Sequence, residues 1–298
     1  MTLRLVVFAL AVIGALAGIF SLWSHLSSDP LSDFQAYYQA GARLNAGQPL
    51  YPPAADPAYQ PYGIDSPVYY RYPPLLAIAM RPLALLPYET AAGIWVVSLI
   101  GVAALTLYRL GITRPGVWLA AGILGLPLAW AFSIGQAQVM VTLLLVIGAP
   151  WSVALAAQLK LLPALAAVYW LGRREWRSLG RFVGYSFGLL AIQFLLMPAE
   201  TLGFPRIVWF DQLGAVVNIS PYVISPALWA ALVIAGAIAA LLLARGRWGW
   251  AAAVSLAVLA SPRLLSYMLS SLLAALRPQG PVPDGPVPEG RAESDRRV

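Results

Sequence analysis

The feature that most constrains this chain is a succession of long apolar stretches that carry almost no charge. Of its 298 residues, 60% are hydrophobic and 10% are charged, whereas soluble domains are about a quarter charged. So few charges cannot cover the surface of a water-soluble globule. The composition therefore excludes a soluble cytosolic enzyme, a disordered chain and a disulfide-bonded secreted domain, and it indicates a polytopic membrane protein. The single histidine and the absence of cysteine also exclude a histidine-rich or thiolate metal site.

The apolar stretches predict an all-α membrane protein built as a bundle of about ten spans, since each span needs about 20 mostly apolar residues. The last stretch is too long for one crossing and is interrupted at Ser261-Pro262-Arg263, which predicts two helices there. The predicted spans cover residues 5–23, 73–86, 90–108, 116–132, 137–149, 152–171, 179–197, 225–244 and 250–276.

Arginine positions predict the orientation, because cytoplasmic loops are enriched in Lys and Arg. With the N-terminus inside, alternation of the predicted spans puts the arginines of 173–181 and 245–247 inside. This assignment requires 73–86 to cross the membrane fully. The net charge of +7 then needs no nucleic-acid partner. The arginines predicted outside are Arg43, Arg71, Arg109, Arg114, Arg206 and Arg263.

The same pattern divides the chain into a transmembrane domain, residues 1–276, and a tail, residues 277–298. The tail is rich in proline and glycine and has no apolar face, so we expect it to be disordered and cytoplasmic. Two loops within the domain, 24–72 and 198–222, are predicted to be external and are long enough to carry chemistry.

The first external loop begins with a predicted helix over 33–44, whose apolar residues recur at helical spacing on one side. Such a helix is expected to lie in the membrane interface. Asp33 at its start has two compatible interpretations, a helix N-cap and a catalytic base. Six tyrosines between Pro49 and Pro74 also have two, an interfacial aromatic belt and stacking surfaces for a sugar ring.

Several polar residues within or beside the apolar stretches stand out. A lysine inside a span is costly and is a candidate for function, so Lys160 is expected to line a cavity, to pair with Gln158 or Gln136, or to snorkel. Gln136 and Gln138 lie at a short break between spans and could simply hydrogen-bond helices together. His25, at the outer end of the first span, is expected to be an interface residue.

Several short motifs, in this order, resemble those of glycosyltransferase family 87 of the GT-C superfamily. The likeness runs from about residue 30 to 275 and rests on the order and spacing of the motifs together. They are Asp33-x-x-x-Tyr37, Ala40-x-Ala42-x-Leu44-x-x-Gly47-x-Pro49-Leu50-Tyr51, Tyr72-Pro73-Pro74, Pro82-Leu83-Ala84-Leu85-Leu86-Pro87, Trp95, Gly135-Gln136, Lys160-Leu161-Leu162-Pro163, Arg173-Arg174-Glu175-Trp176 and Ser261-Pro262.

The resemblance implies a GT-C-like helical bundle whose first external loop carries the catalytic acid. It implies an inverting hexosyltransferase, with Asp33 as general base and a polyprenyl-phosphate sugar, typically mannose in this family, as donor. Cations are then expected to bind the donor phosphate, and polar or aromatic side chains to contact the sugar or the acceptor. The phosphate candidates are Arg71, Lys160 and Arg263, and the sugar or acceptor candidates are Tyr37, Tyr72, Gln136 and Tyr267.

The resemblance also implies a lipid or glycan acceptor, the bilayer as partner and a multi-pass protein of the cytoplasmic (plasma) membrane acting at its outer face. No cofactor is expected; a divalent metal stays open, with no clear site for one. The alternative is a non-enzymatic membrane protein, either a lipid or glycolipid transporter or a degenerate scaffold. A transporter would typically show repeated halves, and no repeat is visible in this chain.

Overall fold

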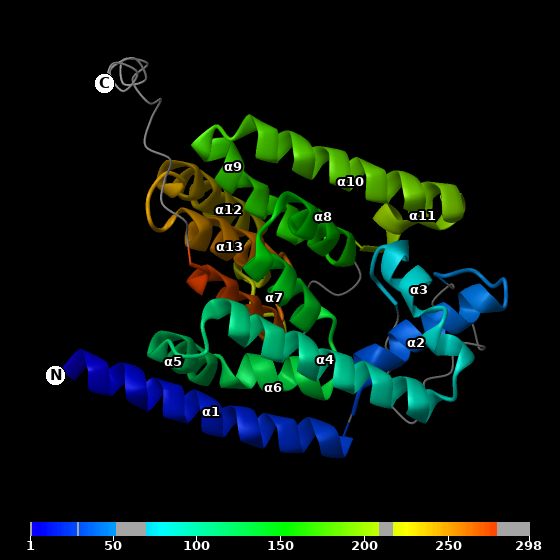
Figure 1. Cartoon of the computed structure of the whole chain (residues 1–298), viewed down its shortest axis with the longest axis horizontal. Helices are drawn as coiled ribbons and strands as arrows, with labels where there is room; N and C mark the ends of the chain where they lie inside the picture. The colour runs from blue at the N-terminus through cyan, green and yellow to red at the C-terminus, as the bar shows by residue number, and fades with distance from the viewer. Residues whose placement is uncertain (1, 29, 52–69, 209–216, 279–298) are drawn as a thin grey trace, which may run out of the picture.

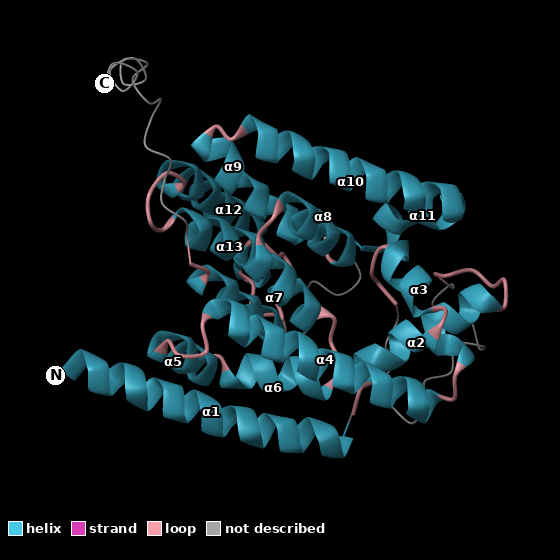
Figure 2. Ribbon diagram, in the orientation of Figure 1, coloured by secondary structure: helices cyan, strands magenta, loops and turns pink. Residues whose placement is uncertain are grey.

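The computed structural model describes residues 2–28, 30–51, 70–208 and 217–278, and in this part of the chain every regular element is a helix (Figures 1 and 2). The all-α prediction is confirmed. The predicted disordered tail lies outside the described residues apart from Arg277 and Pro278. The α-helices are α1 (Thr2–Ser28), α2 (Ser32–Asn45), α3 (Pro74–Met80), α4 (Tyr88–Leu110), α5 (Pro115–Ile123), α6 (Gly125–Ser133), α7 (Gln138–Ile147), α8 (Pro150–Leu159), α9 (Val168–Arg173), α10 (Trp176–Leu196), α11 (Pro198–Val208), α12 (Pro226–Leu243) and α13 (Gly249–Leu259). The 3-10 helices are η1 (Leu83–Leu85), η2 (Leu162–Ala167), η3 (Pro221–Val223) and η4 (Ser266–Leu276).

Helix length does not confirm about ten spans. Among the described residues, four helices are long and apolar enough to cross a membrane: α1, α4, α10 and α12. A fifth crossing results if α5 and α6, which meet at an angle of 68°, form one broken span. The other predicted spans contain shorter helices such as α7, α13 and η4, whose residues pack largely in the interior of the bundle.

The predicted span over 73–86 is not a full-length helix. It contains α3, which has seven residues, and η1, which has three. Seven helical residues rise only about 10 Å, against a hydrocarbon core of about 30 Å. One consequence concerns Arg114, which was predicted outside: its guanidinium donates to the carbonyl of Leu276, 3.1 Å away, beside the tail predicted inside. The prediction of Arg114 outside and the prediction of the tail inside are therefore incompatible.

The two predicted external loops contribute helices to the same end of the bundle. Helices α2, α3 and α11 lie together at the right of Figure 1. The amide N–H of Leu75 donates to the side chain of Gln193 near the end of α10 (3.0 Å), and the rings of Tyr51 and Phe204 are 6.3 Å apart. At the other end of α10, the Arg245 guanidinium donates to the carbonyl of Gly172 (3.3 Å), which joins two of the predicted cytoplasmic turns.

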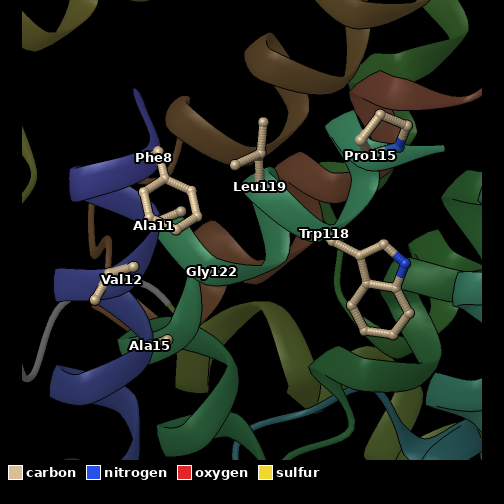
Figure 3. A pocket seen from close by; sticks show the side chains of 8 residues that line it. All are labelled: Phe8, Ala11, Val12, Ala15, Pro115, Trp118, Leu119 and Gly122. Carbon is tan, nitrogen blue, oxygen red and sulfur yellow. The ribbon is translucent and has the colours of Figure 1, made fainter. Parts of the chain in front are cut away.

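Helix α1 packs against α5 and α6 through glycines. A Cβ on Gly125 would lie 2.3 Å from the carbonyl oxygen of Gly14, so only glycine permits this backbone approach, which is typical of helix packing in membranes. Beside this contact lies an apolar groove whose lining contains no charged side chain (Figure 3). A groove without an acid, base or cation offers no catalytic group. Its lining residues are Phe8, Ala11, Val12, Ala15, Pro115, Trp118, Leu119 and Gly122.

Candidate active site

The start of α2 is anchored on the turn between α6 and α7. The carbonyl of Ser133 accepts from the Leu31 N–H (2.8 Å), and the carbonyl of Ile134 accepts from the N–H groups of Asp33 (3.0 Å) and Phe34 (3.2 Å). The N-cap position of α2 belongs to Leu31, which has left-handed backbone geometry. The N-cap interpretation of Asp33 is therefore wrong, because carbonyls from a distant turn satisfy the first N–H groups of the helix.

The Asp33 carboxylate instead belongs to a buried hydrogen-bond network centred on Gln136. The side-chain Nε2 of Gln136 donates to Oδ2 of Asp33. The Tyr37 hydroxyl donates to Oε1 of the same amide (2.7 Å), and the Tyr72 hydroxyl lies 3.0 Å from its Nε2 and 3.1 Å from its Oε1. Gln136 thus connects α2, the segment before α3 and the α6–α7 turn, rather than simply joining two transmembrane helices.

Gln138, two residues further along, does join helices. Its Nε2 donates to the hydroxyl of Ser271 on η4 (2.6 Å), and Thr142 on α7 shares that hydroxyl at 2.8 Å. The two neighbouring glutamines therefore differ in function: Gln138 connects α7 to η4, whereas Gln136 contacts the candidate base.

The tyrosines around Gln136 form a packed aromatic cluster. The ring of Tyr37 is fully buried and contacts the ring of Tyr72 edge to face at 5.1 Å. Burial raises the pKa of both phenols well above the usual value. Both hydroxyls therefore stay protonated and neutral. Tyr37, which lies outside the group of six tyrosines between Pro49 and Pro74, has a fully buried ring and therefore offers no face to the membrane interface or to a sugar.

Lys160 lies at a break between helices. Helix α8 ends at Leu159, and Lys160 has extended backbone geometry before η2 begins. Its ammonium nitrogen is 4.6 Å from the centre of the Tyr267 ring and 5.5 Å from that of Tyr72. That nitrogen is buried and has no hydrogen-bond partner among the described residues, so pairing with Gln158 or Gln136 and snorkelling are both wrong. Its charge interacts with those of Asp33 and Arg263.

Arg263 is positioned by a contact between two loops that sequence reasoning missed. The Asn218 side chain donates to the carbonyl of Pro262 (3.0 Å) and accepts from the N–H of Leu264 (2.9 Å). The hydroxyl of Ser220 donates to the carbonyl of Ser261 (2.8 Å). The predicted break at 261–263 is confirmed, and its signal in the sequence was Ser261-Pro262. The Arg263 Nε is buried without a hydrogen-bond partner in the described part of the chain.

Seven of the eight predicted site residues are connected by these contacts. Asp33, Tyr37, Tyr72 and Gln136 share the hydrogen-bond network, and the ring of Tyr267 lies beneath Lys160 and interacts electrostatically with Asp33 and Arg263. Arg71, the eighth, is half-buried and directly precedes Tyr72 in the chain.

His25 approaches the same cluster through a tryptophan that sequence reasoning did not single out. Its ring stacks on Trp130 at 5.3 Å, and Trp130 contacts the ring of Tyr267 edge to face at 5.7 Å. His25 is thus one aromatic residue away from Tyr267. Three or more His, Cys, Asp or Glu side chains do not come together anywhere in the described ranges, so we assign no metal ligands.

Comparison with known families gives one family match. The family model described as Glycosyltransferase family 87 matches residues 70–276, more than two thirds of the chain. This protein belongs to glycosyltransferase family 87. The match includes Tyr72, Gln136, Lys160, Arg263 and Tyr267, and it begins after α2. No solved structure gives a significant match.

Two similar relatives carry the name polyprenol-phosphate-mannose-dependent alpha-(1-2)-phosphatidylinositol pentamannoside mannosyltransferase. The protein from Mycolicibacterium smegmatis is 28% identical over 217 residues, which cover 67% of this chain and 51% of that relative. The protein from Mycobacterium tuberculosis is 27% identical over 223 residues, which cover 67% and 49%. The chain therefore spans about half the length of the curated relatives that it matches.

Proposed function

We propose that this protein is a membrane glycosyltransferase that transfers a hexose from a polyprenyl-phosphate donor to a lipid or glycan acceptor. In this proposal the hexose is mannose. The observation that carries the proposal is the proximity of one carboxylate, Asp33, to the Lys160 ammonium, which also interacts with Arg263. The Lys160 Nζ and the Arg263 Nε are both buried and lack hydrogen-bond partners in the described structure. Membership of glycosyltransferase family 87 and the names of the two relatives support it.

In the proposed reaction Asp33 is the general base. The acceptor hydroxyl attacks the anomeric carbon while its proton passes to the Asp33 carboxylate. A new bond forms between the acceptor oxygen and that carbon, and the bond from the carbon to the phosphate oxygen breaks. The electron pair of that bond leaves with the polyprenyl phosphate, and attack opposite to the leaving group inverts the configuration.

The leaving phosphate gains one negative charge and therefore needs cations. Lys160 and Arg263 provide two, and their unpaired donors are suited to phosphate oxygens, because unsatisfied buried cations are otherwise costly. Arg71, beside Tyr72, is also proposed to bind the phosphate. The rings of Tyr72 and Tyr267 are proposed to contact the sugar, whereas buried Tyr37 is proposed to act through Gln136.

We propose that the reaction takes place at the outer face of the cytoplasmic membrane. The site lies near the end of the bundle formed by α2, α3 and α11, and the arginine-bearing turn after α9 lies at the opposite end of α10 (Figure 1). Lysine and arginine are enriched in cytoplasmic loops, which supports an external site.

The test is transfer from labelled polyprenyl-phosphate mannose in membranes that contain the protein and extracted lipid acceptors. Asp33→Asn should lower transfer about 100-fold or more at equal protein abundance. Glu89→Gln, which changes an exposed carboxylate on α4 in the same way, should be unaffected. Transfer by Asp33→Asn at the wild-type rate would contradict the role of Asp33. Lipid flipping without any transfer by the wild type would favour the transporter alternative.

A further inference from the structure

The α6–α7 turn, residues 133–136, contacts the candidate base through both backbone and side chain. Its carbonyls fix the first N–H groups of α2, and its last residue, Gln136, reaches the Asp33 carboxylate. Gly135 within the turn has φ +67°, and its carbonyl accepts from the Trp95 indole (2.8 Å). The turn is therefore held rigidly against α2, and the position of Asp33 depends on a segment far from it in sequence.

We propose that Gln136 is a positioning residue that sets the orientation and basicity of the Asp33 carboxylate during sugar transfer. This inference rests on the proposed function, since it assigns Asp33 the role of base. Gln136 acts through Asp33 and does not itself exchange a proton, because a carboxamide is neutral at every pH at which the protein is folded.

The orientation of the Gln136 amide is fixed by its tyrosine partners. The Tyr37 hydroxyl donates to Oε1, which directs Oε1 toward the phenol and Nε2 toward Asp33. Because burial keeps the phenols protonated, this donation persists into the alkaline range. A hydrogen bond to Oδ2 fixes the plane of the Asp33 carboxylate and thereby the direction in which both oxygens point.

Titratable groups from four segments of the chain interact electrostatically with Asp33. These are Tyr37 on α2, Tyr72 before α3, Lys160 after α8 and Tyr267 on η4. Gln136 is the neutral donor in this set. Its hydrogen bond favours the ionised carboxylate, as a cation would, but leaves Lys160 available for a phosphate.

Loss of the amide donor should therefore change proton abstraction more than donor binding. In Gln136→Met, which keeps the length of the side chain, we expect kcat to fall about 10- to 100-fold while the donor KM changes less than about threefold. The acid limb of the kcat/KM profile should move to higher pH, because the ionised carboxylate has lost a hydrogen bond. In Gln136→Glu, a second carboxylate replaces the donor, and the acid limb should move further in the same direction.

Gln138→Met is the matched control. It removes the same group from a buried glutamine at the start of α7, but that group contacts Ser271 rather than Asp33. We expect it to lower the unfolding temperature in detergent without shifting the pH profile. The assay uses labelled polyprenyl-phosphate mannose, with transfer followed from acidic to alkaline pH and protein abundance measured in parallel.

Two results would overturn the inference: a pH profile of Gln136→Met that coincides with that of Gln138→Met, or a loss confined to the donor KM. If Gln136→Met fails to fold, the pH profile of Gln136→Glu tests the inference instead. This variant is expected to fold, since its carboxylate can still accept from Tyr37 and Tyr72. Failure of the proposed function is distinguishable, because the wild type itself would then transfer no sugar.

Discussion

The ammonium nitrogen of Lys160 lies 4.6 Å above the centre of the Tyr267 ring, and it has no hydrogen-bond partner among the described residues. Contact with ring faces compensates a buried cation only in part, at about 0.5–2 kcal/mol. The charge of Arg263 interacts with the Lys160 ammonium and repels it. The arrangement therefore holds positive charge at a cost in stability, which is expected where an anion binds.

Replacement of Lys160 should separate stability from function. Lys160→Met removes an unpaired buried charge and keeps the length of the side chain, so the unfolding temperature should rise. The KM for polyprenyl-phosphate mannose should rise about tenfold or more, because a hydrogen bond to a charged group contributes about 1.5–3 kcal/mol. Thermal unfolding in detergent and steady-state kinetics measure the two effects.

Gln158→Met, near the end of α8 and two residues before Lys160, is the control and should leave the donor KM unchanged. Lys160→Arg keeps the charge but changes its geometry, so we expect an intermediate KM. A stabilised Lys160→Met protein with the wild-type donor KM would show that Lys160 does not bind the phosphate.

Asn218 should affect the site through Arg263. In Asn218→Ala, the N–H groups of Ser220 and Leu264 lose their acceptor, and the free energy of unfolding should fall by about 2 kcal/mol or more. In Asn218→Asp the acceptor remains and only the donor to the Pro262 carbonyl is lost, so the decrease should be smaller. Both variants should raise the donor KM. An unchanged KM in a folded Asn218→Asp protein would mean that the loop contact does not position Arg263.

Local sequence patterns predicted the fold where the decisive interactions are local. The spacing of aromatic residues after Asp33 predicted a helix, and α2 spans Ser32–Asn45. Ser261-Pro262 predicted a break, and α13 ends just before it. The length of the apolar stretches did not predict full-length helices correctly at residues 73–86 and 152–171, because prolines and a buried lysine interrupt the helices there.

The candidate site was predictable as a set of residues and not as a geometry. Asp33 and Gln136 are separated by 103 positions, and no local pattern indicates that their side chains meet. The same limitation explains why Asn218 and Trp130 were missed, since their contacts are with Pro262 and Tyr267. Tyr37 was selected as a site residue by its motif, and its hydroxyl bonds Gln136, but only packing reveals that its ring is buried.

Gln193 should determine how α3 is held against α10. Its buried side-chain oxygen accepts from the N–H of Leu75 at the start of α3. Gln193→Leu leaves this N–H without a partner, so we expect a loss of about 1–3 kcal/mol in the free energy of unfolding and faster proteolysis near α3. Thermal unfolding and limited proteolysis in detergent measure this. Protease resistance equal to wild type would indicate that other contacts suffice to dock α3.

Gly135 should be intolerant of any side chain. Its φ of +67° costs an L-residue about 1–2 kcal/mol, and an added Cβ would lie 2.8 Å from the Cβ of Phe34. Gly135→Ala should therefore push α2 away from the turn, lowering both the unfolding temperature and sugar transfer. The control is Gly180→Ala on α10, where a Cβ meets open space and the helix gains stability. If Gly135→Ala matches Gly180→Ala in both measurements, the turn does not hold α2 and Asp33 in place.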